Sequence, residues 1–452
     1  MVPFFKSGSR YDDGNYRGIS LTSVCCKTME RVLKPQIVAY LEENGLLSDF
    51  QFGFRRGRST EDQLLVFYHR VSGWVDTGHT VDVVYLDFSK AFDVVSHTIL
   101  LAKLDCLGFD PLVQGWIRAF LVGRTMAVSV AGTRSSAREV TSGVPQGSVL
   151  GPVLFLVYVN FVTAGIDCDW MAFADDFKLC ICYPKRSGEA STAGRAALQE
   201  AINRIADVGL TWSLSLNAGK CVVVRFGECR AAEGEREPYT LNGSALEFVG
   251  SYRDLGVIID DKLRFHSHID SVVRKAGGLM GNLLRATKCR SRCFMVSLFV
   301  SHIRPIIDYC SSVWNVGFLG DARRLEVLQR RWTREVEGMR GLQDEARLRA
   351  TGLYSVWGRL LRLDLIKIWK AHHAEEEVGL GGMFEYSVRN SRGHNLKLSV
   401  PICRTEVKRR LLAVRWVAVW NSLPAEVVEV GSVATFKTHL DVFLGDRLFA
   451  VV

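Results

Sequence analysis

Two acidic positions within apolar, strand-like sequence constrain the fold and the chemistry of this chain more than any other feature. Residues 81–88 form a short, nearly continuous apolar run, typical of a buried strand, and Asp87 lies near its end. The pair Asp175-Asp176 separates two β-rich runs within residues 171–183, which predicts a hairpin with acids at its tip. A buried carboxylate is unfavourable unless it is paired or bound to a metal.

Three such acids, if they converge, would suit a pair of divalent metal ions. Hard cations take oxygen ligands, and two metals about 4 Å apart can hold the attacking and leaving oxygens of a phosphoryl transfer. The alternative for any single Asp-Asp pair is a solvated turn, which is our interpretation of Asp12-Asp13 and Asp260-Asp261. Spacing alone leaves both interpretations open for Asp175-Asp176.

Composition excludes several other classes of protein. Of the 452 residues, 48% are hydrophobic and 23% are charged, which is close to the globular average and argues against global disorder. The first ten residues lack the apolar core of a secretory signal. The one long uncharged stretch, 140–166, is densely apolar only at 153–162. It is therefore interpreted as a turn followed by a buried helix, and no membrane contact is expected.

The positive charge is concentrated in one part of the chain. The formal net charge is +9, but residues 271–373 alone hold 19 Lys and Arg against 8 Asp and Glu. Such a block beside a nearly neutral remainder is typical of a protein that binds a phosphate backbone, although solvated helical faces would give the same composition. Within it, Arg323-Arg324 and Arg330-Arg331 are seven residues apart and recur on one helical face. Leu325 and Leu328 are expected to anchor the opposite face.

Six segments occur in a fixed order and together carry a family resemblance. They are Asn15-Tyr-Arg-Gly-Ile-Ser-Leu21, Gln51-Phe-Gly-Phe-Arg-Arg-Gly-Arg-Ser-Thr60, Asp87-Phe-Ser-Lys-Ala-Phe-Asp93, Ser142-Gly-Val-Pro-Gln-Gly-Ser-Val-Leu-Gly-Pro152, Phe173-Ala-Asp-Asp176 and Asp254-Leu-Gly-Val257. The chain resembles the reverse transcriptase of a non-LTR retrotransposon of the jockey-like kind. A weaker likeness continues through His302–Cys310 and Trp420–Pro424.

The resemblance implies an α/β right-hand polymerase fold. Fingers and a palm with an antiparallel sheet would occupy 1–262, a basic helical thumb 263–345, and a mostly helical C-terminal region 346–452. Related elements carry an upstream endonuclease domain, whereas this sequence opens almost directly at the fingers, so it is interpreted as a polymerase core plus C-terminal region without that domain.

The resemblance also assigns catalytic roles. Asp87, Asp175 and Asp176 would bind two Mg²⁺ ions, with Mn²⁺ as an alternative, and Lys220 resembles the lysine proposed to protonate the leaving pyrophosphate. The expected reaction is RNA-directed DNA synthesis, in which a primer 3′-OH attacks a dNTP on an RNA template.

Further residues match positions that contact substrates in the family. Lys6 and Arg17 would grip the dNTP triphosphate, although each could be an ordinary surface charge. Phe92 matches the steric gate against a ribose 2′-OH, with core packing as the alternative. Gln146 matches the residue that contacts the incoming nucleotide and its template base. Leu255-Gly256 resembles the primer grip.

Nucleic-acid backbone contacts are expected from two arginine groups. These are Arg55, Arg56 and Arg58, and then Arg323, Arg324, Arg330 and Arg331. The expected partners are therefore an RNA template, a DNA primer and dNTPs. The expected location is intracellular, in the nucleus or in a cytoplasmic ribonucleoprotein.

Some positions depart from the family pattern. Gly18, Phe177 and Ala218 stand where Pro, Thr and Pro are usual, and Phe161 stands where Asp is usual. None of these changes removes a predicted metal ligand. The intact acids favour an active polymerase, whereas Gly18 and Phe161 favour an alternative, a catalytically inactive nucleic-acid-binding remnant. A second alternative is a maturase-like RNA-binding factor on the same fold.

Overall fold

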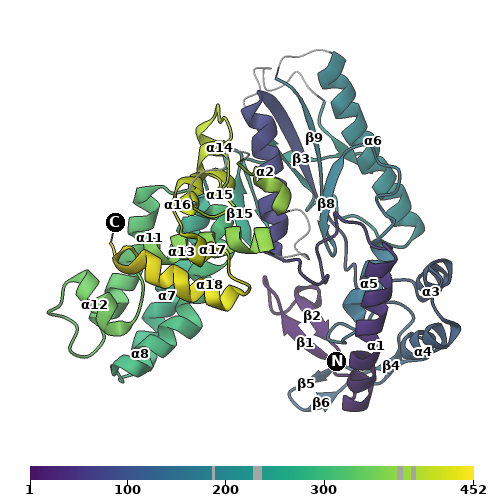
Figure 1. Ribbon diagram of the computed structural model, residues 1–452. Coiled ribbons are helices and arrows are strands. Elements are labelled where there is room, and N and C mark those ends of the chain that lie inside the picture. Colours follow the sequence, from purple (N-terminus) through teal and green to yellow (C-terminus); the bar gives the residue numbers. More distant parts are fainter. Residues whose placement is uncertain (186–188, 228–236, 374–379, 388–392, 452) are drawn as a thin grey trace. The chain divides into compact units, whose positions relative to one another are not determined.

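The computed structural model describes residues 1–185, 189–227, 237–373, 380–387 and 393–451, and the chain folds into two compact units (Figure 1). Unit 1 comprises Met1–Arg58, Asp82–Val223 and Cys229–Phe248. Unit 2 comprises Ser59–Val81, Val224–Glu228 and Val249–Val452. The chain therefore passes from one unit to the other several times.

A five-stranded sheet in the order β13-β10-β3-β9-β8 belongs mainly to unit 1. The β8–β9 pair is antiparallel, as predicted, whereas the β10–β13 pair is parallel. The strands of this sheet are β3 (His79–Asp87), β8 (Asp169–Phe173), β9 (Asp176–Pro184), β10 (Val222–Phe226) and β13 (Glu247–Phe248). The predicted strand at 81–88 and the predicted acidic hairpin are both confirmed.

Among the described residues, unit 1 also contains short two-stranded ladders, five α-helices and a 3-10 turn (Asp13–Asn15). The ladder strands are β1 (Val2–Phe5), β2 (Tyr16–Ile19), β4 (Thr125–Met126), β5 (Ser129–Val130), β6 (Thr133–Arg134), β7 (Arg138–Glu139), β11 (Thr240–Leu241) and β12 (Ser244–Ala245). The helices are α1 (Val24–Glu43), α3 (His97–Cys106), α4 (Pro111–Leu121), α5 (Gly151–Val159) and α6 (Glu189–Thr211). Every residue of α5 except Pro152 is buried, which confirms the buried helix predicted within 140–166.

Unit 2 is mostly helical. Its hairpin consists of β14 (Ser251–Asp254) and β15 (Val257–Asp260). Its helices are α2 (Thr60–Asp76), α7 (His266–Ala286), α8 (Arg292–Leu298), a π-helical turn (Phe299–Ile303), α9 (Arg304–Asp308), α10 (Ser311–Trp314), α11 (Leu319–Arg334), α12 (Asp344–Thr351), α13 (Val356–His373), α14 (Glu406–Arg410), α15 (Leu412–Arg415), α16 (Val417–Asn421), α17 (Ala425–Val428) and α18 (Val433–Leu444). The predicted α/β class with a helical second half is confirmed.

Helix α2 belongs to unit 2, in which two of its acidic side chains, Asp62 and Asp76, are buried and paired. The Lys367 ammonium on α13 donates to the carboxylate of Asp62. Near the other end of α2, the carboxylate of Asp76 accepts hydrogen bonds from the backbone N–H groups of Arg404 (2.8 Å) and Thr405 (2.6 Å). The two compact units follow a different division of the chain. The domain boundaries expected after residues 262 and 345 stay predictions.

Among the described residues, none of the helices combines the length and the apolar character that crossing a bilayer would require.

Candidate active site

The turn between β8 and β9 carries the first candidate acid. Phe173 pairs with Asp176 across the antiparallel ladder, so Ala174 and Asp175 form a two-residue turn. Ala174 has a φ of +59°, a left-handed conformation that a residue with a Cβ rarely adopts. Asp175 is half-buried within the turn, and the exposed Asp176 opens β9.

The second candidate acid, Asp87, ends β3. Its backbone carbonyl accepts a hydrogen bond from the N–H of Asn217 at 2.8 Å. The Lys220 ammonium lies 3.2 Å from its Oδ2 atom. That oxygen is shielded from solvent and accepts no hydrogen bond of acceptable geometry. Lys220 is close enough for an ion pair but poorly aligned for a hydrogen bond, which leaves a buried anionic oxygen available to another cation.

Electrostatics link four of the predicted residues. Burial raises the pKa of the Asp175 carboxyl, and the negative charge of Asp87 raises it further. The positive charges of Arg17 and Lys6 act in the opposite direction and lower it. Asp175 therefore lies within electrostatic reach of three other predicted site residues, one acid and two cations.

The two cations belong to the β1–β2 hairpin. Arg17 lies on β2 opposite Phe4 of β1, and Lys6 follows β1 directly. The backbone N–H of Lys6 donates to the carbonyl of Asn15 at 2.9 Å, which closes the base of the hairpin loop. Both side chains are exposed, as residues that meet a soluble anion should be.

A complete metal cage is not formed by the protein side chains alone. Within the described ranges, no group of three or more His, Cys, Asp or Glu side chains is gathered closely enough to hold a metal ion. The donor set still fits a hard divalent cation in part, because Asp87 offers a buried oxygen without a hydrogen bond and Asp175 lies near it. The convergence of all three acids stays a prediction.

Phe92 and Gln146 lie on two loops that are bonded to each other. The backbone N–H of Val144 donates to the carbonyl of Phe92 at 2.9 Å, and the Gln146 amide donates to the carboxylate of Asp93 at 2.7 Å. The half-buried Phe92 ring stacks on Phe155, with ring centroids 4.2 Å apart. This packing suits either a gate or a core residue, so both interpretations stand.

The predicted primer grip lies in unit 2. Asp254 pairs with Val257, and Leu255 and Gly256 form the two-residue turn between β14 and β15, with φ values of +44° and +87°. The Tyr309 hydroxyl donates to the Leu255 carbonyl at 2.7 Å. The turn is therefore fixed from outside its own hairpin.

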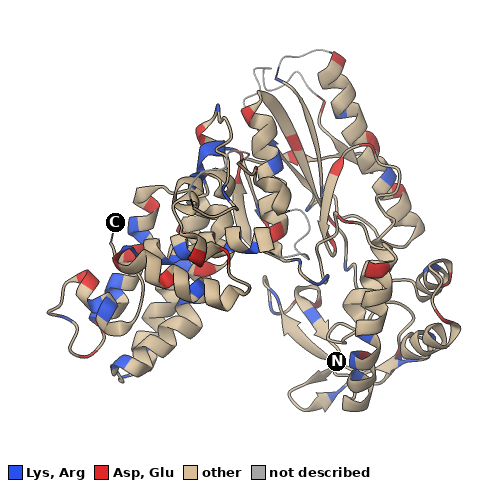
Figure 2. Cartoon of the chain, in the orientation of Figure 1, with Lys and Arg blue, Asp and Glu red and all other residues tan. Residues whose placement is uncertain are grey.

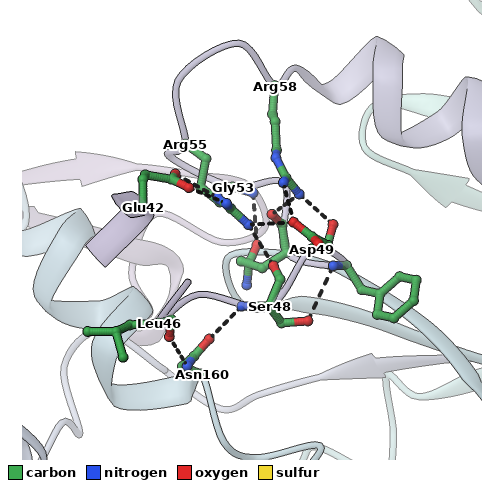
Figure 3. A network of polar contacts seen from close by, with 10 residues as sticks. Glu42, Leu46, Ser48, Asp49, Gly53, Arg55, Arg58 and Asn160 are labelled. Atoms are coloured by element: carbon green, nitrogen blue, oxygen red, sulfur yellow. Dashed lines mark hydrogen bonds and ion pairs between the residues drawn. The ribbon is translucent and has the colours of Figure 1, made fainter. Parts of the chain in front are cut away.

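Two of the three arginines near residue 55 are turned inward. The side chains of Arg55 and Arg58 are only 6% and 3% exposed. Arg55 bonds to Glu42 and to the carbonyl of Ser48, and Arg58 bonds to Asp49 (Figure 3). These partners neutralise both guanidinium groups within the protein. Arg56 is exposed.

The arginines of α11 divide in a similar way. Arg324 pairs with Asp270 and Asp321, and Arg330 pairs with Asp344. Arg323 and Arg331 are exposed on the outer face of the helix, and Figure 2 shows the basic segments of unit 2 in blue. Leu325 and Leu328 are buried on its inner face, which confirms the predicted anchoring.

Two buried polar residues were not identified from the sequence. Gln51 is only 4% exposed and bonds to the turn that carries Asp175. Asp82, fully buried within β3, accepts hydrogen bonds from the hydroxyls of Tyr183 and Tyr239, both at 2.9 Å, and pairs with Arg195. Two features of the sequence could have indicated them. Asp82 is a charged residue within an apolar strand, and Gln51 is the first residue of the motif Gln51–Thr60.

Comparison with known proteins now identifies the family. The model of the reverse transcriptase (RNA-dependent DNA polymerase) family matches residues 6–268. This chain belongs to the reverse transcriptase family. The match covers more than half of the chain and includes the acids at positions 87, 175 and 176.

The most similar reverse transcriptases include polymerases of mobile elements. The chain is 31% identical to the RNA-directed DNA polymerase from mobile element jockey of Drosophila funebris, over 75% of this chain and 37% of that protein. It is 28% identical to the probable RNA-directed DNA polymerase from transposon BS of Drosophila melanogaster, over 89% of this chain and 42% of that protein. The chain thus spans about two fifths of these relatives, and the predicted resemblance to jockey-like reverse transcriptases is confirmed.

Among solved structures, the telomerase of Candida albicans aligns with a TM-score of 0.40 and 11% identity, over 82% of this chain and 59% of that one.

Proposed function

We propose that this chain is the RNA-directed DNA polymerase segment of a non-LTR retrotransposon protein. One observation carries the proposal: the Asp175 carboxyl, in a hairpin turn, lies within electrostatic reach of Asp87, at a strand end, and of Lys6 and Arg17. Paired carboxylates beside fixed cations suit a reaction in which a metal-assisted hydroxyl displaces a negatively charged pyrophosphate.

In the proposed site, Asp87 and Asp175, together with Asp176, would hold divalent cations, preferably Mg²⁺. Bound in this way, such ions supply Lewis acidity that activates the primer 3′-OH and neutralises charge on the triphosphate. Lys6 and Arg17 would bind and orient the triphosphate from the β1–β2 hairpin. Lys220, 3.2 Å from Asp87, would hold the proton that the leaving pyrophosphate takes up.

Other residues would select and orient the substrates. The exposed edge of Phe92 would contact the sugar of a dNTP and exclude a 2′-OH, and Gln146 would contact the nascent base pair. The Leu255-Gly256 turn would contact the primer. Arg56, Arg323 and Arg331, which are exposed, would contact the backbone of an RNA template or its hybrid without reading sequence. We also propose that the chain acts inside the cell, where RNA templates and dNTPs occur.

Primer extension tests this proposal. The assay uses poly(rA)/oligo(dT) with dTTP and Mg²⁺, and compares the wild type with Asp175→Asn and with Asp207→Asn, whose carboxylate is exposed on α6. We expect Asp175→Asn to abolish extension while nucleic-acid binding stays measurable, and Asp207→Asn to behave as the wild type.

Two results would contradict the proposal. Extension by Asp175→Asn at the wild-type rate would exclude Asp175 from catalysis. A folded wild type that binds the template–primer but does not extend it would instead indicate a nucleic-acid-binding remnant.

A further inference from the structure

The turn that carries Asp175 is held in an unfavourable conformation. A left-handed φ is unfavourable for a residue with a Cβ, and Ala174 has a φ of +59°. Such strain persists only where the surrounding structure enforces it. The contacts that enforce it here come from Gln51, a residue to which the proposed mechanism assigns no role.

Gln51 makes the contacts that hold this turn. Its Oε1 atom accepts hydrogen bonds from the backbone N–H groups of Gly53 (2.8 Å) and Ala174 (2.9 Å), and its Nε2 atom donates to the carbonyl of Ala174 (3.4 Å). The side chain thus bonds both polar groups of Ala174. Only an acceptor and a donor at the end of one planar group can do so, and a carboxamide provides both without charge.

The backbone beside Gln51 approaches the turn just as closely. The N–H of Phe52 donates to the carbonyl of Ala172 at 2.8 Å, and the N–H of Ala172 donates to the carbonyl of Phe50 at 2.9 Å. Gly53 follows, and a Cβ added there would lie 2.3 Å from the backbone nitrogen of Ala174. Residues 50–53 therefore form a short edge that fits against β8 and its turn.

Two buried arginines donate hydrogen bonds to backbone carbonyls of this edge and of the two residues, 48 and 49, that lead into it. Arg58 donates to the carbonyls of Asp49 and Gln51, the latter at 3.1 Å, and Arg55 donates to the carbonyl of Ser48 at 2.7 Å. Figure 3 shows both guanidinium groups directed into the loop that contains Ser48 and Asp49. Charged donors to backbone carbonyls make strong hydrogen bonds, so the loop is a firm support for the Gln51 side chain.

We propose that Gln51 is a positioning residue of the polymerase site, which fixes the Ala174 peptide and thereby the Asp175 carboxylate, with Arg55 and Arg58 as its support. The inference rests on the proposed function. Its physical basis is that groups holding a metal ligand in place contribute about 10–100-fold to metal affinity or activity. It also explains why a motif rich in arginine contains two guanidinium groups that solvent barely reaches.

Mn²⁺ binding to the full chain, followed by the electron paramagnetic resonance signal of the free ion, tests the inference without relying on activity. The variants are Gln51→Met, which keeps the side-chain length and loses all three bonds, and Asn160→Ala as a matched control. Asn160 holds the same loop, by bonds to the N–H of Ser48 (3.1 Å) and the carbonyl of Leu46 (2.6 Å). Asp175→Asn identifies the binding that depends on the site.

We expect Gln51→Met to weaken the Asp175-dependent Mn²⁺ binding by about 10–100-fold, and to speed amide hydrogen exchange at Ala174. Asn160→Ala should change Mn²⁺ affinity by less than about twofold, whatever its effect on the melting temperature, since it leaves every bond to Ala174 intact. Equal losses in both variants would mean that Gln51 only stabilises the fold, and would overturn the inference.

Gln51→Glu provides a second readout, in case Gln51→Met does not fold. A neutral carboxyl reproduces both the acceptor and the donor of the amide, whereas the ionised form cannot donate to the Ala174 carbonyl. A buried Glu can have a pKa as high as about 8–9. The Mn²⁺ affinity of Gln51→Glu relative to wild type should therefore rise as the pH falls from about 8 to about 6. A constant ratio would count against the positioning role.

The same experiments separate the inference from the proposed function. A wild type that binds Mn²⁺ through Asp175 but extends no primer would contradict the polymerase proposal alone, and the Gln51 comparison would still decide the inference. Absence of Asp175-dependent Mn²⁺ binding in the wild type would overturn the inference itself.

Discussion

The two tight turns to which the proposed function assigns roles, one in each unit, are built in contrasting ways. At Ala174-Asp175 a residue with a Cβ is left-handed, and a buried amide from Gln51 bonds both of its backbone groups. At Leu255-Gly256 both residues have a positive φ, and the hydroxyl of the 44% exposed Tyr309 bonds a single carbonyl. The first turn carries a charged side chain and is fixed by buried contacts. The second presents backbone and is fixed at the surface, so the two should respond very differently to the same kind of substitution.

The largest difference is expected from adding a methyl group to Gly53, which packs against the first turn, and to Gly256, which forms part of the second. In Gly53→Ala the new Cβ meets backbone of Ala174, which cannot move without disturbing the sheet, so the free energy of unfolding should fall by about 1–3 kcal/mol or more. In Gly256→Ala the nearest atom is Cε1 of the Tyr309 ring at 3.1 Å, and the cost should be about 1–2 kcal/mol from the positive φ alone.

Urea unfolding of both variants measures this difference. Mn²⁺ binding separates them further, because only Gly53→Ala should weaken it. Equal losses of stability would show that the close approach at Gly53 relaxes, and that the first turn is less constrained than the contacts suggest.

The next effect concerns Asp254, the buried residue that precedes the second turn. The Tyr68 hydroxyl donates to the carboxylate of Asp254 at 2.7 Å, and both side chains are buried. Tyr68→Phe removes a hydrogen bond to a charged group and should cost about 1.5–3 kcal/mol. The melting temperature of Tyr68→Phe is compared with that of Tyr85→Phe, which alters a second buried tyrosine. A loss below about 0.5 kcal/mol would indicate that other donors satisfy Asp254.

A smaller effect is expected at the surface of the same turn. Tyr309→Phe keeps the ring against Gly256 and removes the bond to the Leu255 carbonyl, together with the contacts of the hydroxyl with Thr60 and Cys310. Water can replace that donor, so the loss of stability should be about 0.5–1.5 kcal/mol. If the turn acts as the primer grip, the variant should raise the KM for template–primer more than it lowers kcat. A change in kcat alone would argue against that role.

The smallest effect is a pH-dependent gain of stability at the first turn. The pKa of Asp175 is raised in the folded protein, chiefly by burial, so its ionisation opposes folding. This penalty is absent below the ordinary carboxyl pKa of about 4 and is complete above the raised value. Asp175→Asn should therefore melt at a higher temperature than wild type at neutral pH, and the gain should shrink as the pH falls towards 4. A gain in melting temperature that does not change with pH would mean that Asp175→Asn acts through packing instead.

Local sequence patterns predicted the residues whose positions depend only on their neighbours in the sequence. The end of an apolar run located Asp87 at the end of β3, and two β-rich runs located the Asp175 hairpin, because strand alternation and a two-residue turn are local properties. Leu325 and Leu328 followed from helical periodicity in the same way.

The residues that depend on distant partners could not be predicted. Arg55 and Arg58 were expected to contact a nucleic-acid backbone, whereas their guanidinium groups are buried against partners within the protein. Their neutralising partners include Glu42 on α1 and backbone carbonyls that only the folded loop brings near. Asp82 is satisfied by Tyr183, Arg195 and Tyr239, which lie more than 100 residues away.

The bond between Lys367 and Asp62 has a consequence for the synthesis of this protein. The two residues are 305 positions apart, and ribosomes add about 5–20 residues per second. Roughly 15–60 s therefore pass between the emergence of the acid and the arrival of its counter-charge. During that time α2, whose side chains are buried on most sides in the folded unit, is exposed on the nascent chain, where a chaperone could bind it.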